Sequence, residues 1–219
     1  MTSEWVDLTQ PFDADAPHSA ALPAPEFETL SDVATDGVNA QWFGTPTHVG
    51  THVDAPRHMV EGGATIDDLP LARFTGEGVV LDVARDEPDP VTVADLAAAD
   101  GAVEAGDIVV VRTGWGERYG DDDYGRYPWL ADEVATWLLE REVHLLAVDT
   151  PSPDRPRELR PDDWDAYPIH RALLPEGVPI AEHLRVPASL AGDRVELQAF
   201  PLRLRGGDGA PARVVARHP

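Results

Sequence analysis

Three histidines and an aspartate occur within eleven residues of this 219-residue chain, in the segment HVGTHVDAPRH that runs from His48 to His58. Neutral imidazoles and a carboxylate are the ligands that a divalent ion such as zinc or manganese binds. Ligands so close in sequence lose little chain entropy when they are brought together. The segment therefore indicates a metal site. The alternative is four polar residues that only hydrogen-bond on a loop, and the spacing alone leaves it open.

The local sequence limits the shape of this segment. His48 and His52 are four residues apart, so one helical turn would bring both side chains to one face. Gly50 permits non-helical conformations, and Pro56 disfavours helical geometry at Ala55. We therefore expect an irregular turn that follows a strand, and not a long helix.

The composition limits the remaining chemistry. The chain has no Cys, which excludes disulfides, thiolate nucleophiles and cysteine-bound metals. It has 40 acidic residues against 17 basic ones, all of them Arg, and a net charge of -23. This charge argues against nucleic-acid binding, which requires a basic surface. No apolar run reaches the length of about 18 residues that predicts a membrane span.

The same composition predicts a location. The N-terminus lacks the basic and apolar regions of a secretory signal, so we expect a cytoplasmic protein. An acidic chain without Lys or Cys is typical of proteins adapted to high salt, where screening weakens the repulsion between like charges. We therefore expect a saline cytoplasm.

Strand and helix patterns alternate along what we expect to be a single domain of residues 1–219. β-Branched runs at 79–83 and 108–112 predict buried strands, and residues 92–99 predict a helix with Thr92 as its N-cap. Strand, helix and strand in succession favour an α/β class with mixed α+β layers around a central sheet. The other predicted strands are 5–8, 41–47, 144–148, 178–181 and 195–204, and the other predicted helices are 132–142 and 170–174.

Three loops follow predicted strands, at residues 48–58, 113–123 and 149–154. The ends of strands are a common location for sites in layered α/β folds. We therefore expect the three loops to share one pocket.

The segment from His48 to His58 resembles the His-x-Gly-Thr-His-x-Asp-x-Pro-x-His signature of the cyclase family, metal-dependent hydrolases that include bacterial kynurenine formamidase and isatin hydrolase. The resemblance continues at four further places in order along the chain. These are RTGW (112–115), VDTPSPD (148–154), His170 with Glu182 twelve residues later, and AFPLRLRGGDGAPAR (199–213). Together they extend from about residue 5 to the end of the chain.

The resemblance implies a swivelling β/β/α fold and an assembly of at least two subunits. It implies that His48, His52 and Asp54 bind one ion. Asp54, His170 and Glu182 would bind a second ion, with Asp54 between the two. His58 would stand beside the ions as the general acid and base.

These implied roles agree with elementary metal chemistry. A divalent ion, zinc or manganese, lowers the pKa of bound water from about 15.7 toward about 7 and so supplies a hydroxide nucleophile. The ion also polarises the substrate carbonyl, and an imidazole can pass the proton to the leaving nitrogen. We therefore predict hydrolysis of a C–N bond in a small non-peptide amide, with arylformamides such as N-formylkynurenine first.

Three alternatives are open. Hydrolysis of a cyclic amide, as by isatin hydrolase, comes second, because the presence of both His170 and Glu182 favours a formamidase. A mononuclear iron oxygenase also uses two His and one carboxylate, but a cupin-like oxygenase would have few helices between its strands. A non-catalytic metal-binding protein would keep the ligands and would not need His58.

Other residues complete the expected pocket. Trp42, Phe43 and Trp115 are candidates to stack on an aromatic substrate, although single aromatic residues near strand ends are more often in the core. Asp149 and Ser152 are candidates for the pocket wall, with turn formation as the alternative.

The other histidines are assigned less specific places. His183 follows Glu182 and would point away from it on a strand, so we expect it at the surface or behind the ligands. His144 is expected to be structural, His18 lies in an early loop (13–28) without an assigned role, and His218 lies at the C-terminal end.

Overall fold

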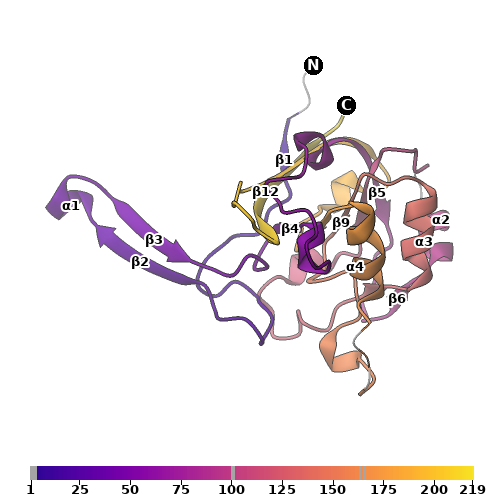
Figure 1. The fold of residues 1–219 in the computed structure, drawn as a ribbon, viewed down its shortest axis with the longest axis horizontal. Helices are drawn as coiled ribbons and strands as arrows, with labels where there is room; N and C mark the ends of the chain where they lie inside the picture. The colour runs from indigo at the N-terminus through magenta and orange to yellow at the C-terminus, as the bar shows by residue number, and fades with distance from the viewer. Residues whose placement is uncertain (1–3, 100–101, 163, 165) are drawn as a thin grey trace.

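The computed structural model describes residues 4–99, 102–162, 164 and 166–219 (Figure 1). Its α-helices are α1 (Val33–Asp36), α2 (Val93–Ala98), α3 (Glu133–Glu140) and α4 (Pro168–Leu173). Its strands are β1 (Val6–Asp7), β2 (Glu26–Ser31), β3 (Ala40–Gly44), β4 (His52–Asp54), β5 (Thr75–Asp82), β6 (Pro90–Val91), β7 (Ile108–Arg112), β8 (Trp129–Leu130), β9 (Leu145–Val148), β10 (Ile180–Glu182), β11 (Arg194–Pro201) and β12 (Gly209–Arg217). Among these residues, no helix is both long enough and apolar enough to cross a membrane.

The main sheet of the described residues closes on itself. Its strand order is β1-β12-β11-β5-β7-β9-β10-β4, and β12 also pairs with β4, so that seven strands form a ring to which β1 is added. Strands β5, β7, β9 and β10 run parallel to one another, and the remaining pairs in this sheet are antiparallel. The mixed α/β class that the sequence predicts is confirmed.

The parallel strands separate two hydrophobic clusters. Val80 and Val110 belong to the cluster inside the ring of strands. Their neighbours Val79 and Val109 face the opposite way and pack with apolar residues of α2, α3 and α4. Strands buried on both faces are apolar at every position, which explains why the sequence shows β5 and β7 so clearly.

The predicted helix at 92–99 is confirmed as α2. Its N-cap is Thr92, whose side chain accepts a hydrogen bond from Asp95 N, while the Asp95 carboxylate accepts one from Thr92 N. This reciprocal capping box satisfies two backbone donors at the start of the helix.

The turn predicted for residues 48–58 is wrong at its centre. Residues 52–54 form β4, which pairs with β10 on one side and with β12 on the other. The 3-10 turn Pro56–His58 follows. Pairing with two distant strands therefore overrides the local preference for irregular structure.

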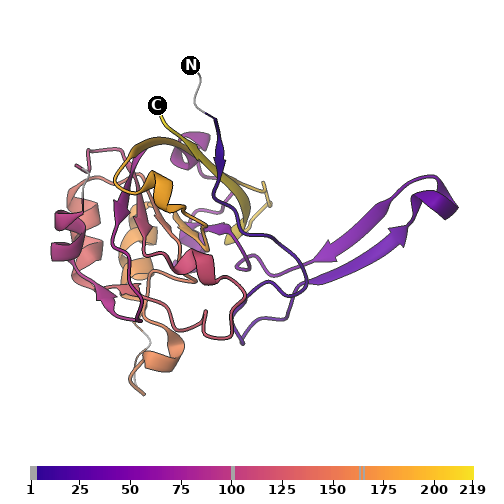
Figure 2. The same ribbon diagram turned by 180° about the vertical axis from the view of Figure 1, so that it is seen from behind.

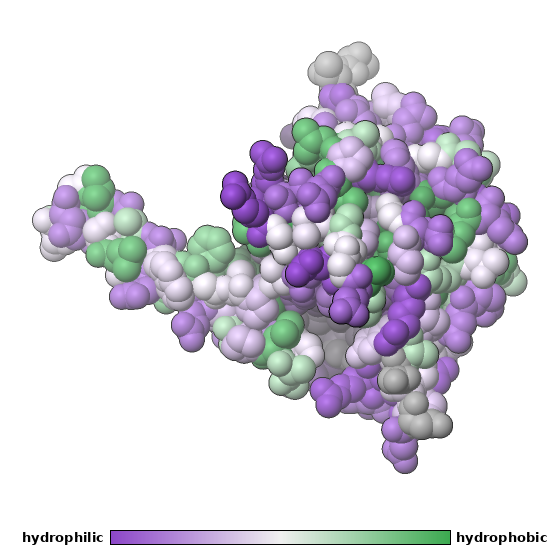
Figure 3. Space-filling view, in the orientation of Figure 1, coloured by the Kyte–Doolittle hydropathy of each residue, from purple (hydrophilic) through white to green (hydrophobic). Residues whose placement is uncertain are grey.

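A two-stranded arm, residues 26–44, projects from the body of the protein (Figures 1 and 2). In it β2 pairs antiparallel with β3, so the early loop predicted for residues 13–28 ends before residue 26. Large apolar side chains are exposed along the arm (Figure 3), including Leu30 (59%) and Val38 (61%). A two-stranded hairpin by itself is only marginally stable in water.

Candidate metal centre

Strand pairing brings the predicted ligands together. His52 and Asp54 are two residues apart on β4 and therefore point to the same face. β10 pairs antiparallel with β4 so that Glu182 lies directly opposite His52. On the other side of β4, Gly209 lies opposite Asp54, and a Cβ there would stand 2.7 Å from His48 Cε1. A glycine at 209 therefore leaves the space that the His48 ring occupies.

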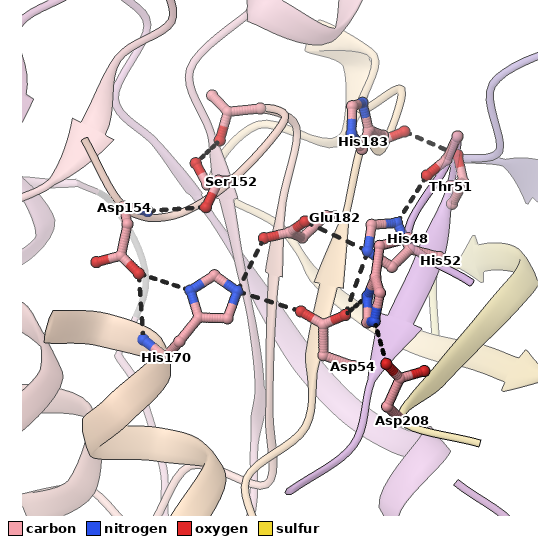
Figure 4. A network of polar contacts seen from close by, with 12 residues as sticks. His48, Thr51, His52, Asp54, Ser152, Asp154, His170, Glu182, His183 and Asp208 are labelled. Carbon is pink, nitrogen blue, oxygen red and sulfur yellow. Dashed lines mark hydrogen bonds and ion pairs between the residues drawn. The ribbon is translucent and has the colours of Figure 1, made fainter. Parts of the chain in front are cut away.

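Asp54 lies between two sets of histidines (Figure 4). Its Oδ1 is 2.7 Å from His48 Nδ1 and 3.2 Å from His52 Nε2. Its Oδ2 is 3.2 Å from His170 Nε2, and that nitrogen is also 3.3 Å from Glu182 Oε1. The two carboxylate oxygens thus face the two ligand groups that the sequence proposes.

The donor atoms of this cluster fit a divalent cation. His48 Nε2, His52 Nε2 and Glu182 Oε1 are buried, and none of them has a contact of hydrogen-bond geometry among the described residues, although each lies 3.2–3.3 Å from a polar atom of Asp208, Asp54 or His170. His52 Nε2 lies 3.4 Å from Glu182 Oε2, but the pair does not have the geometry of a hydrogen bond. Buried polar atoms without partners are costly, and imidazole nitrogen with carboxylate oxygen is a donor set that zinc and manganese accept.

Three groups of side chains place their ligand atoms within 4.8 Å of one another. They are Asp54 with His170 and Glu182, His48 with Asp54 and His58, and His52 with Glu182 and His183.

The electrostatics of the cluster also favour a cation. Burial raises the pKa of Glu182, and the charge of Asp54 adds to this effect. Burial also acts to raise the pKa of Asp54, but the charge of His52 and the hydrogen bonds of His170 and His48 hold it well below its ordinary value. Burial acts to lower the pKa of His48, but the hydrogen bond to Asp54 and its charge raise it to about 9. Protons and a metal ion therefore compete for the same negative charge.

His58 lies beside these ligands at the end of the turn that Pro56 begins. Its ring centroid is 3.9 Å from that of His48 and 5.7 Å from that of His170. Burial lowers the pKa of His58 to about 4, against the charge of Asp54 and together with the charges of His48 and His170. His58 is therefore close enough to the other ligands to act either as a proton carrier or as a ligand itself.

The three candidate stacking residues lie in two different environments. Trp115 is 2% exposed, its Nε1 donates to Tyr124 O at 2.9 Å, and the Arg118 guanidinium covers its ring at 4.1 Å. Trp115 is therefore in the core, which is the alternative that the sequence left open for it. Trp42 and Phe43 are on the arm, 46% and 50% exposed, and Phe43 lines a cavity together with Phe12 and with Thr51, the residue before His52.

Asp149 and Ser152 have structural contacts. The Asp149 carboxylate accepts hydrogen bonds from Thr113 N, Thr113 Oγ1 and Gly114 N, and so ties the end of β9 to the end of β7. The turn-forming alternative therefore describes Asp149 better than a place in the pocket wall. Ser152 Oγ accepts a hydrogen bond from Asp154 N at 3.3 Å.

His183 is buried beside the ligands, which is the second of the two places expected for it, but its side chain does not point away from Glu182 as expected. It is 5% exposed, and its ring centroid is 5.9 Å from that of His52. Its Nδ1 is 3.0 Å from Tyr124 Oη. A left-handed backbone conformation (φ 58°) ends the regular alternation of β10, so the rule that neighbours point to opposite faces fails here.

Two carboxylates at the site were not singled out by the sequence. Asp154 Oδ2 lies 2.6 Å from His170 Nδ1, and Asp208 Oδ2 lies 3.2 Å from His48 Nε2. Both belong to segments that carry the family resemblance, VDTPSPD and RGGDGAP, so their position in those motifs was the available signal.

Comparison with known proteins agrees with this geometry. Residues 6–155 match the model of the Cyclase family, described as "Putative cyclase". A kynurenine formamidase of Salinibacter ruber is 36% identical over 171 residues, 78% of this chain and 76% of that protein. Isatin hydrolase A from Ralstonia solanacearum has a TM-score of 0.83 at 27% identity, over 99% of this chain and 92% of its own. A structure titled as a potential metal-dependent hydrolase with cyclase activity has a TM-score of 0.81 at 28% identity, over 100% of this chain and 99% of its own. The chain therefore belongs to the cyclase family and is a metal-dependent amide hydrolase, which confirms the enzyme class that the sequence predicted.

Proposed function

We propose that this enzyme hydrolyses the formamide C–N bond of an arylformamide of the N-formylkynurenine type. The observation that supports this most is the buried cluster in which Asp54 lies between His48 and His52 on one side and His170 with Glu182 on the other. The substrate class follows the curated relative from Salinibacter ruber, which is a kynurenine formamidase.

The residues of the cluster have different roles in the proposed reaction. His48, His52, Asp54, His170 and Glu182 would hold a divalent ion, which would supply electrophilic activation of water and of the substrate carbonyl. His58 takes the proton of the attacking water, because its ring lies beside the ligands and its lowered pKa keeps it unprotonated, and so able to accept a proton, at neutral pH. The same ring then delivers this proton to the departing aryl amine nitrogen. Formate and the free amine are the products, and His58 returns to its neutral form.

A substrate panel tests the substrate class. Purified protein in high salt, supplied with zinc or manganese, is assayed with N-formylkynurenine, with isatin and with a simple aryl ester. We expect turnover of N-formylkynurenine to exceed that of the other two and to disappear with a chelator. Preferential ring opening of isatin would replace the proposal with the cyclic-amide alternative, which the structural similarity to isatin hydrolase A favours.

The metal content is proposed to be two zinc or manganese ions per subunit, with Asp54 shared between them. The separate directions of Asp54 Oδ1 and Oδ2 toward the two ligand groups support this stoichiometry. Elemental analysis of protein purified without chelator measures it. One ion per subunit at saturation would refute it.

The assembly is proposed to be a homodimer, or a higher homo-oligomer, joined through the arm. The exposed apolar residues Leu30 and Val38 on a hairpin that has little support of its own favour burial against a second copy. Sedimentation of the Leu30→Asp variant measures whether the assembly depends on the arm. Leu71→Asp is the control, because Leu71 is 71% exposed and lies outside the arm. We expect Leu30→Asp to dissociate and Leu71→Asp to behave as wild type. A wild-type monomer would contradict the proposal.

The proposed environment is a saline cytoplasm, supported by the net charge of -23 and the absence of Lys and Cys. In such a medium, salt screens the repulsion within each subunit and between subunits.

A further inference from the structure

Asp154 is a buried carboxylate that the proposed reaction does not use. It lies in the loop that follows β9, and its side chain is 0% exposed. Its Oδ2 is 2.6 Å from His170 Nδ1, and its Oδ1 accepts a hydrogen bond from Ile169 N at 2.9 Å. Figure 4 shows the carboxylate on the side of the His170 ring that faces away from Asp54 and Glu182.

The contact with Asp154 decides which nitrogen of His170 is free. An ionised carboxylate only accepts hydrogen bonds, so His170 Nδ1 must be the donor. In the neutral ring the lone pair is then on Nε2. Nε2 is the atom that lies 3.2 Å from Asp54 Oδ2 and 3.3 Å from Glu182 Oε1. Asp154 therefore selects the tautomer that presents a ligand atom to the cluster.

His52 shows the same arrangement with a weaker partner. Its Nδ1 is 2.8 Å from the carbonyl oxygen of Gly50, which leaves Nε2 facing Asp54 and Glu182. A carbonyl fixes the ring but adds no net charge. Asp154 fixes the ring and adds a negative charge behind it, so removal of that charge should weaken cation binding on the His170 side in particular.

We propose that Asp154 is a positioning residue that holds His170 as an Nε2 ligand and sets the cation affinity of the group formed by Asp54, His170 and Glu182. This inference rests on the proposed metal-dependent function. Ser152, whose Oγ accepts a hydrogen bond from Asp154 N, helps to hold the loop that carries the carboxylate.

The experiment compares Asp154→Asn with Asp107→Asn. Asp107 is also buried (3% exposed) and accepts hydrogen bonds from Arg194 and from Glu104 N, but it precedes β7 at the opposite ends of the parallel strands. Zinc affinity of the metal-stripped, full-length proteins is measured by competition with a chromophoric chelator, and folding is checked by thermal melting. We expect Asp154→Asn to bind one zinc ion about 10- to 100-fold more weakly, the usual effect of losing such a partner. Asp107→Asn should keep the wild-type zinc affinity even where its melting temperature falls.

Two results would overturn the assignment. One is a folded Asp154→Asn protein with wild-type zinc affinity, and the other is an equal loss of affinity in Asp107→Asn. If Asp154→Asn does not fold, ¹⁵N NMR of histidine-labelled, zinc-loaded wild-type protein decides instead, with His170→Gln used for assignment. A proton on His170 Nδ1 supports the proposal, and a proton on Nε2 refutes it. None of these measurements needs a substrate, so failure to hydrolyse arylformamides would refute the proposed function without affecting this result.

Discussion

Replacement of His58 by Asn separates the catalytic role proposed for this residue from a role as a ligand. The His58 ring lies against that of His48, tilted by 39° with 3.9 Å between centroids, and its ligand atom lies within 4.8 Å of those of His48 and Asp54. Asn is polar and of similar width, but its side chain cannot take up and release a proton during the reaction. The substitution therefore removes proton transfer and leaves the other proposed ligands in place.

The expected loss follows from the function removed. General acid–base catalysis contributes about 10²- to 10⁴-fold to a rate. At about 1.36 kcal/mol for each factor of ten, this equals about 2.7–5.4 kcal/mol of transition-state stabilisation. Metal content should not change, because both oxygens of Asp54 and the nitrogens of His52 and His170 keep their positions.

The assay is kcat/KM for N-formylkynurenine together with metal per subunit by elemental analysis. His144→Asn is the control, because His144 is also partly buried but precedes β9, at the opposite end of the strand from Asp149. We expect the control to stay within about twofold of wild type. A wild-type rate in His58→Asn would refute the role of general base. Loss of metal with an unchanged rate per bound metal would show that His58 is a ligand.

Other perturbations test the remaining parts of the argument. Glu182→Gln should lower metal content toward one ion per subunit, and full content by elemental analysis would exclude the two-metal arrangement. His52→Ala should lose most bound metal, and a fully loaded variant would contradict the assignment of the histidine segment. Leu145→Ala, inside the ring of strands at 0% exposure, should cost about 2–5 kcal/mol in urea unfolding, and a cost below about 1 kcal/mol would mean that the interior is poorly packed. The melting temperature should rise by several degrees between about 0.05 and 2 M potassium chloride, and an unchanged value would refute the adaptation to salt inferred from the charge of -23.

Local sequence signals identified the features that depend on neighbours along the chain. Thr92 and Asp95 form their capping box within four residues, and the β-branched residues of β7 indicate a strand buried on both faces. The close spacing of His48, His52 and Asp54 indicated a metal site in the same way, because ligands so near in sequence need little help from the rest of the fold.

The tertiary structure decided what depends on segments far apart in the chain. β4 exists because residues 52–54 pair with β10 and β12, and that register places Glu182 opposite His52. The large aromatic side chain of Trp115 would suit a substrate-stacking residue. Only its contacts with Tyr124 and Arg118 show that it belongs to the core. Asp154 acquires its contact with His170 from two segments that only the fold brings together. Spacing in the sequence shows which residues can act together locally. Strand register and side-chain burial depend on contacts between distant segments, and the free energy of those contacts cannot be read from any one short segment.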